Sequence, residues 1–223
     1  MGLAERACSA EYEMLLAMDD AKKKELSRQR FNRHVSGYEA TLAGWHSSRM
    51  KDAALRRVHR PVDGPVLDVG CGPGILLATL AGENPSLVLA GIDLAPEMIR
   101  AAQVRLGARA ELRVGDAEDL PWDDGQFGVV TCIDSFHHYP KPARAMAEMF
   151  RVLKPGGLLV IADPWAPPVV RHAINLFITL RRSADVMVYG KHEMMLMLQS
   201  AKFERATWET EGRFGFVVTA VAG

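Results

Sequence analysis

The sequence has no excess of charge of either sign, because 27 lysines and arginines balance 27 aspartates and glutamates. A neutral chain has no long-range attraction for polyphosphates, which argues against a general binder of nucleic acid or of anionic membranes. A local patch of charge is still compatible with this balance. We therefore expect neither nucleic acid nor a membrane among the partners of this protein.

Cysteine is scarce. The three residues, Cys8, Cys71 and Cys132, lie far apart, and no two of them form a Cys-x-x-Cys pair. This spacing excludes a zinc site built from cysteines, and we expect no metal. A small, odd number of cysteines is typical of a reducing compartment.

Long apolar runs are missing as well. The longest one, near residues 173–180, is far too short to span a bilayer. The first residues include acidic side chains and no long apolar stretch, so they do not resemble a secretory signal. Together with the cysteine usage, these absences predict a soluble, cytoplasmic protein.

The distribution of proline and glycine divides the chain of 223 residues in two. Residues 1–60 contain no proline and carry apolar side chains at roughly helical spacing, which predicts an N-terminal cap of two or three helices. Residues 61–223 form the predicted main domain, with an apolar helical insert at about 164–188.

Short apolar runs alternate with amphipathic segments from Val66 onward, a pattern that indicates a parallel sheet covered by helices. After the insert, two runs joined by a short turn indicate antiparallel strands, so we expect a mixed, mostly parallel sheet. The predicted strands cover residues 66–69, 87–92, 111–114, 127–133, 157–162, 203–208 and 214–221. The predicted helices cover residues 74–80, 96–106, 142–153, 169–180 and 192–201.

A glycine-rich loop gives the strongest functional signal. The segment VLDVGCGPG, residues 66–74, stands between a predicted strand and a predicted helix. Glycines there allow a tight turn and the close approach of a ligand at the carboxyl edge of the sheet. A dinucleotide site favours a third glycine where this chain has Ile75, and Asp68 would oppose a pyrophosphate but suit a cation. The loop therefore departs from the dinucleotide pattern.

Five segments in order resemble the motifs of the class I S-adenosylmethionine-dependent methyltransferases, in particular the subgroup of ubiquinone-biosynthesis and small-molecule enzymes. They are the glycine loop, GIDLAPEMI at 91–99, GDAEDLPWDDGQFGVV at 115–130, TCIDSFHHYP at 131–140 and RVLKPGGLLVIADP at 151–164. One glycine loop is weak evidence of a resemblance to this family, whereas five motifs in the expected order are strong evidence. The resemblance implies a Rossmann-like, doubly wound α/β fold. Its sheet would be seven-stranded and mostly parallel with a final antiparallel strand, and N-terminal helices would form a lid.

The resemblance also implies how S-adenosylmethionine would bind. Asp93 would accept hydrogen bonds from both ribose hydroxyls, and Asp116, with the Ala117 backbone, would face the adenine amine. Other residues would face the methionine end, pack on the adenine or place an aromatic ring over the cofactor. The implied cofactor-binding residues are Tyr38, Asp68, Gly70, Gly72, Asp93, Leu94, Met98, Asp116, Ala117 and Ile133.

Two histidines follow the fourth predicted strand, where the resemblance places the methyl group. An imidazole that titrates near neutral pH suits the removal of a proton from an acceptor, so His138, and after it His137, are the candidate catalytic residues. We also form the hypothesis that the N-terminal helices and the apolar insert, which includes Phe177, make a lid over an apolar small molecule.

We therefore expect transfer of a methyl group from S-adenosylmethionine to an oxygen, nitrogen or carbon atom of a small molecule, with S-adenosylhomocysteine as product. The alternative is a cofactor-binding regulatory or scaffold protein without turnover, because methyl transfer needs no obligatory catalytic side chain. A nicotinamide-dependent oxidoreductase is less favoured, because of Ile75 and Asp68. The sequence leaves open whether the protein forms a homo-oligomer.

Overall fold

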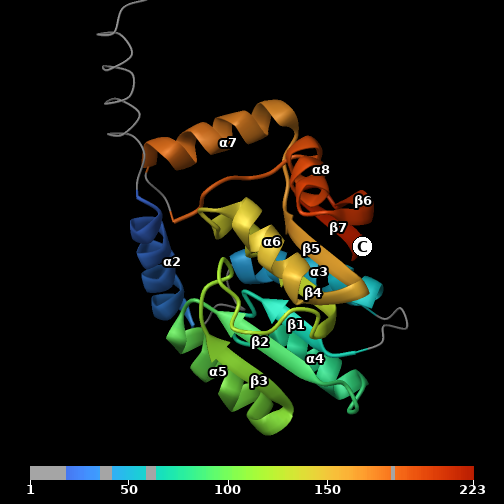
Figure 1. Cartoon of the computed structure of the whole chain (residues 1–223). Coiled ribbons are helices and arrows are strands. Elements are labelled where there is room, and N and C mark those ends of the chain that lie inside the picture. Colours follow the sequence, from blue (N-terminus) through green and yellow to red (C-terminus); the bar gives the residue numbers. More distant parts are fainter. Residues whose placement is uncertain (1–18, 36–41, 59–63, 182–183) are drawn as a thin grey trace, which may run out of the picture.

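The computed structural model describes residues 19–35, 42–58, 64–181 and 184–223, and gives only the backbone at residues 34 and 42–47. A seven-stranded sheet forms its centre, with helices packed on both faces (Figure 1). The strands are β1 (Val66–Val69), β2 (Leu89–Asp93), β3 (Ala110–Val114), β4 (Phe127–Ile133), β5 (Leu153–Pro164), β6 (Phe203–Glu211) and β7 (Gly215–Ala222).

The strands lie in the order β3-β2-β1-β4-β5-β7-β6. Pairing is parallel from β3 through to β5, and β7 is antiparallel to both of its neighbours. From β1 the chain continues outward through β2 to β3 on one side of the β1–β4 pair. From β4 it continues outward to β5 on the other side. In open α/β sheets, ligands bind at the carboxyl ends of the strands at such a switch point.

The helices fall into three groups along the chain. Those before the sheet are α2 (Asp20–His34) and α3 (Leu42–Val58), and those that connect parallel strands are α4 (Ile75–Glu83), α5 (Pro96–Leu106) and α6 (Pro142–Val152). After β5 come α7 (Pro168–Arg181) and α8 (Lys191–Ser200). Short 3-10 turns, η2 (Gly107–Arg109) and η3 (Phe136–His138), follow α5 and β4.

The core has two parts, one on each face of the sheet. One cluster joins the sheet to α3, α4 and α5, and the other joins it to α6 and α8. Neighbouring residues of β4, such as Val129 and Val130, belong to different clusters because side chains alternate along a strand. Every residue of β4 is buried, as expected for a parallel strand that is covered on both faces.

The predicted fold class is confirmed, and all seven predicted strands form. The largest difference is at β5, which begins at Leu153, not at residue 157. Leu153 pairs with Phe127 ahead of a register shift in β4, so the Lys-Pro-Gly-Gly segment belongs to the strand. The predicted boundary between residues 60 and 61 lies outside the described residues and stays a prediction. No helix in the described ranges has the length and apolar character needed to cross a membrane.

Candidate functional site

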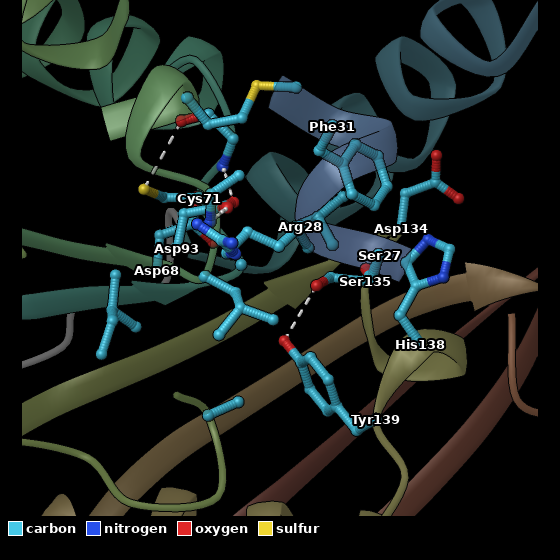
Figure 2. A pocket seen from close by; sticks show the side chains of 18 of the residues that line it. Ser27, Arg28, Phe31, Asp68, Cys71, Asp93, Asp134, Ser135, His138 and Tyr139 are labelled. Atoms are coloured by element: carbon cyan, nitrogen blue, oxygen red, sulfur yellow. Dashed lines mark hydrogen bonds between the residues drawn. The ribbon is translucent and has the colours of Figure 1, made fainter. Parts of the chain in front are cut away.

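A cavity of about 240 Å³ lies at the carboxyl edge of the parallel strands. Its walls come from the loop after β1, from the ends of β2 and β4, from the loop after β3, and from α2 and α3. Figure 2 shows the strand-end carboxylates Asp68 and Asp93 on one side of this space, and Phe31 of α2 and His138 on another. The site therefore combines the switch point of the sheet with a cover of N-terminal helix.

Backbone hydrogen bonds hold the loop after β1 against β2. The N–H groups of Gly70 and Cys71 both donate to the Ile92 carbonyl, at 2.8 and 2.9 Å. Gly70 and Gly72 have φ angles of 74° and 51°, in the left-handed region that favours glycine. A Cβ atom on Gly70 would collide with the Ser135 side chain, whereas one on Gly72 would meet open space. Gly70 thus serves packing, and Gly72 leaves the backbone open to a ligand.

This difference predicts that Gly70→Ala lowers the free energy of unfolding by more than about 1–2 kcal/mol, the cost of a left-handed residue with a Cβ atom. The matched control is Gly82→Ala within α4, because an added Cβ atom at Gly82 would meet open space and not another side chain. Alanine is the better helix former, so the control should gain about 0.5–1 kcal/mol. Denaturant unfolding measures both changes, and equal effects of the two variants would contradict the packing role of Gly70.

Two carboxylates in the cavity have no cationic partner among the residues that the structure describes. Asp68 of β1 is 3% exposed and accepts a hydrogen bond from the Thr131 hydroxyl at 2.7 Å. Asp93, at the end of β2, accepts the N–H groups of Gly72 and Ala95 at 2.9 and 2.8 Å, one on each oxygen. Neither carboxylate forms an ion pair within the described part of the chain.

The electrostatic consequence is that the cavity disfavours the charged form of each of these carboxylates. Burial raises the pKa of Asp68 to about 7, and the nearby charge of Asp93 adds to this shift. Burial also raises the pKa of Asp93 to about 6, although its two backbone hydrogen bonds oppose the change. Both shifts would be reversed by a cation in the cavity. The arrangement therefore favours a cationic ligand and disfavours a pyrophosphate.

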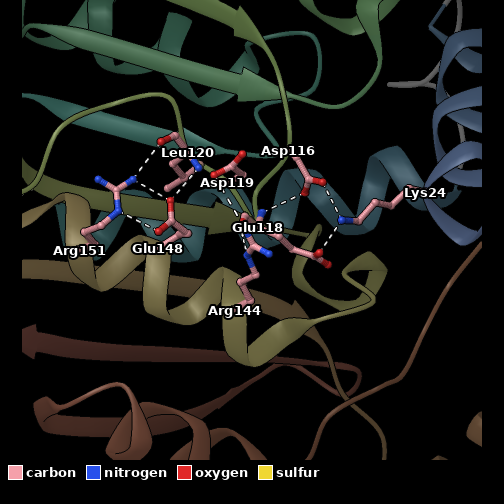
Figure 3. A network of polar contacts seen from close by, with 8 residues as sticks. All are labelled: Lys24, Asp116, Glu118, Asp119, Leu120, Arg144, Glu148 and Arg151. Atoms are coloured by element: carbon pink, nitrogen blue, oxygen red, sulfur yellow. Dashed lines mark hydrogen bonds and ion pairs between the residues drawn. The ribbon is translucent and has the colours of Figure 1, made fainter. Parts of the chain in front are cut away.

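Charged side chains of α2 and α6 fix the loop after β3 (Figure 3). The Lys24 Nζ atom of α2 donates to Asp116 at 2.6 Å and also to Glu118. On the other side, Arg144 Nε of α6 donates to the Glu118 carbonyl at 2.7 Å. These contacts hold the buried Ala117 at the cavity wall.

One face of α2 covers the cavity. The sequence analysis expected a lid of N-terminal helices but did not identify the residues of α2 that face the cavity. Lys24, Ser27, Arg28 and Phe31 line the cavity. Their spacing of three, four and seven residues is that of a single helix face, which is the signal that could have found them. Because this face is mostly polar, a search for apolar periodicity overlooked it.

The two predicted catalytic histidines lie in different environments. His138 lines the cavity, and its Nδ1 atom lies 3.1 Å from Asp185 Oδ1. His137 does not line the cavity, and its Nδ1 atom lies 3.0 Å from Oδ1 of the fully buried Asp163. The two imidazole rings are neighbours, with centroids 3.9 Å apart. Only His138 is placed to meet a ligand in this cavity.

The structure brings together most of the residues predicted from the sequence. No residue of α7, Phe177 included, lines the cavity, and the hypothesis that the insert is part of a lid over the acceptor stays a prediction. Tyr38 lies outside the described residues. The predicted cofactor-binding residues that line the cavity are Asp68, Gly70, Gly72, Asp93, Leu94, Met98, Asp116, Ala117 and Ile133.

Comparisons with known proteins agree with this arrangement. Residues 67–161 match the family model of a methyltransferase domain. A demethylmenaquinone methyltransferase from Clavibacter sepedonicus is 32% identical over 170 residues, which cover 73% of this chain and 69% of that protein. A demethylmenaquinone methyltransferase from Deinococcus radiodurans is 34% identical over 128 residues, which cover 56% of this chain and 51% of that protein. The chain thus spans about half the length of the Deinococcus relative.

A solved structure shows the same fold. The crystal structure of a methyltransferase from Aquifex aeolicus that depends on S-adenosylmethionine superposes with a TM-score of 0.62 and 22% sequence identity. It covers 93% of this chain and 100% of the Aquifex chain. Together with the Clavibacter relative, the ordered motifs and the cavity at the switch point, these findings assign the family. The chain belongs to the class I S-adenosylmethionine-dependent methyltransferases.

Proposed function

We propose that this protein binds S-adenosylmethionine in the cavity and transfers its methyl group to a small-molecule acceptor. The observation that carries the proposal is a pair of carboxylates beside the glycine loop, the buried Asp68 and the half-buried Asp93, which have no cationic partner among the residues that the structure describes. S-adenosylmethionine carries a sulfonium and an ammonium group, and this pair would balance that charge. The family membership supports the same cofactor.

The residues around the cavity fit the parts of this cofactor. Each Asp93 oxygen accepts one backbone N–H group and keeps lone pairs for the ribose hydroxyls. Asp68 and the open backbone at Gly72 would face the methionine end. Leu94 and the buried Met98 would pack on the adenine.

Lys24 adds a condition for adenine binding. It already donates to one Asp116 oxygen, while the other oxygen accepts the Glu118 N–H group at 2.9 Å. A carboxylate has about four lone-pair positions, so the adenine amine could share Asp116 with Lys24. Asp116 would then bind the adenine and Lys24 at the same time. In this way α2 and the loop after β3 would be joined at the bound cofactor.

When bound, the cofactor supplies a methyl group that is already activated on sulfur. The protein's own part is to bring the acceptor close to this methyl group and to orient it. Where the acceptor must lose a proton, we propose that His138 takes it, because this imidazole lies in the cavity wall and contacts Asp185 on its other side. His137 would act only through His138, since it stays outside the cavity.

The acceptor is proposed to be a small molecule because the cavity is about 240 Å³ and is covered by α2. The similarity to demethylmenaquinone methyltransferases makes demethylmenaquinone the first acceptor to test. A cytoplasmic location is also a proposal, supported by the free and buried Cys71 and Cys132.

Calorimetric titration with S-adenosylmethionine, S-adenosylhomocysteine and NAD tests the cofactor. We expect the first two to bind and NAD not to bind. Asp93→Ala should weaken binding of S-adenosylmethionine by about 1.5–3 kcal/mol, the scale of hydrogen bonds to a charged group. The control Asp123→Ala changes an exposed aspartate in the loop before β4 and should leave the affinity unchanged.

Equal affinity of wild type and Asp93→Ala would overturn the ribose assignment, and binding of NAD alone would overturn the cofactor. Turnover is tested separately by measuring S-adenosylhomocysteine formed across a panel of acceptors. Cofactor binding without any turnover would favour a regulatory or scaffold protein.

A further inference from the structure

Helix α7 turns its apolar side away from the protein. Val169, Leu180 and Phe177 are 84%, 65% and 56% exposed, and only Ile178 of α7 is buried. A helix that packs on a core normally shows the opposite arrangement. We define the α7 face as the exposed apolar residues Val169, Val170, Ile174, Leu176, Phe177 and Leu180.

Polar contacts hold α7 in this orientation. Arg171 donates to Glu193 of α8 at 2.9 Å. The side chain of Asn175 exchanges two hydrogen bonds with the backbone of Val188, at 3.1 and 2.9 Å. Arg171, Asn175 and Ile178 are spaced four and three residues apart, so they lie on one side of the helix. The fold therefore presents the α7 face outward through specific contacts.

The chain around α7 carries positive charge only. Between residues 164 and 184 the sequence holds three arginines and a histidine but no aspartate or glutamate. Arg181 is the last residue of α7, and Arg182 follows it in the sequence. The Arg181 guanidinium lies over the ring of Phe177, 4.9 Å from its centroid. The exposed apolar surface is thus bordered by the cationic group of Arg181.

The neighbouring helix α2 is also basic. It contains six lysines and arginines against two acidic residues. A hydrogen bond of 2.8 Å between Arg30 of α2 and Asp185 joins it to the segment after α7. Figure 1 shows α7 across the top of the molecule, with α2 below its C-terminal end. The overall neutrality of the chain therefore conceals an excess of basic residues on α2, the helix below the C-terminal end of α7.

From this combination we propose that the α7 face docks on an anionic lipid bilayer. An apolar helix face bordered by arginines lies in the plane of a bilayer, where apolar side chains enter the acyl boundary and the cations meet anionic headgroups. A second copy of this chain fits less well, because a twofold contact would bring the basic groups at the end of α7 of the two copies toward each other. The proposal does not depend on the proposed function.

Sedimentation of the full-length protein with vesicles tests the docking. One set of vesicles is phosphatidylcholine alone, and the other has equal parts of phosphatidylcholine and phosphatidylglycerol. We expect binding to the anionic vesicles that weakens as salt is added. The double variant Phe177→Asp/Leu180→Asp should bind at least about tenfold more weakly, because it loses two large apolar side chains and gains two negative charges.

The matched control is Val104→Asp on α5, since Val104 is 90% exposed but lies far from α7 in the chain. It should bind vesicles like the wild type. All substituted side chains are exposed, and thermal unfolding and the S-adenosylmethionine titration check that each variant is intact. No binding by the wild type, or equal binding by the double variant, would overturn the proposal. A dimer in solution that the double variant dissociates, without vesicle binding, would assign the α7 face to a second copy instead.

Discussion

Replacing His138 with glutamine is expected to lower the turnover number by about 10²–10⁴-fold on an acceptor that must lose a proton, the range that a general base contributes. His138 lies in the cavity wall, with Asp185 3.1 Å from its Nδ1 atom and the Phe31 ring edge-on at 5.1 Å. Glutamine keeps a polar side chain but cannot take up a proton. The affinity for S-adenosylmethionine should stay unchanged, which separates this loss from a loss of binding.

The pH dependence of turnover gives a second readout of the same residue. Burial, together with the charge of neighbouring His137, lowers the pKa of His138, and this outweighs the opposing effect of Asp185. Burial acts against the charge of His137 too, but Asp163 raises the pKa of His137 to about 9. A base must be neutral, so turnover should fall only below the ordinary histidine pKa of about 6.5. His138→Gln should lose this acid limb.

The control is His192→Gln, because His192 is an exposed histidine on α8. Activity should also be measured with EDTA, since donor atoms of His137, His138 and Asp185 lie within 4.8 Å of one another and could bind a cation. We expect EDTA to have no effect. A His138→Gln variant as active as the wild type would show that orientation alone is sufficient and that His138 is not the base.

The sheet could be predicted because its signals are local. A wholly buried strand such as β4 is a continuous apolar run, and the glycines after β1 mark the turn at the switch point. The start of β5 was misplaced because Leu153 belongs to the strand only through its pairing with Phe127. That pairing joins residues far apart in the chain, so no local pattern reports it.

The candidate site shows the same division between local and distant information. The aspartates at the strand ends, such as Asp68 and Asp93, stand inside motifs and were found. The residues of α2 that cover the cavity were not found, although a lid of N-terminal helices was expected, because Lys24 meets Asp116 across 92 positions of sequence. The orientation of α7 was also beyond the sequence, since an apolar helix is normally read as buried. The contacts of Arg171 and Asn175, with the burial of Ile178, show which side faces inward.

Asp68→Asn is expected to stabilise the cofactor-free protein and to weaken cofactor binding. The pKa of Asp68 is raised from 3.8 to about 7, so the fold favours its protonated form. Stability from this group is present at low pH and is lost as the pH rises from about 4 to about 7. Asparagine cannot ionise, and its oxygen can still accept from Thr131. The gain at about pH 8 should be on the order of 2–4 kcal/mol, with little change at about pH 4.

The same substitution should cost affinity, because the carboxylate that destabilises the empty cavity is the one that a cation needs. Binding of S-adenosylmethionine should lower the pKa of Asp68 and release a proton near neutral pH, which titrations in buffers of different ionisation enthalpy detect. Asp68→Asn should remove most of this release and weaken binding by about 1.5–3 kcal/mol. Asp123→Asn, in the exposed loop before β4, should change neither quantity.

If Asp68→Asn left both the stability at about pH 8 and the proton release as in the wild type, Asp68 would already be ionised in the empty cavity. The charge of the cofactor would then have to be balanced elsewhere, and the half-buried Asp93 would be the next carboxylate to test.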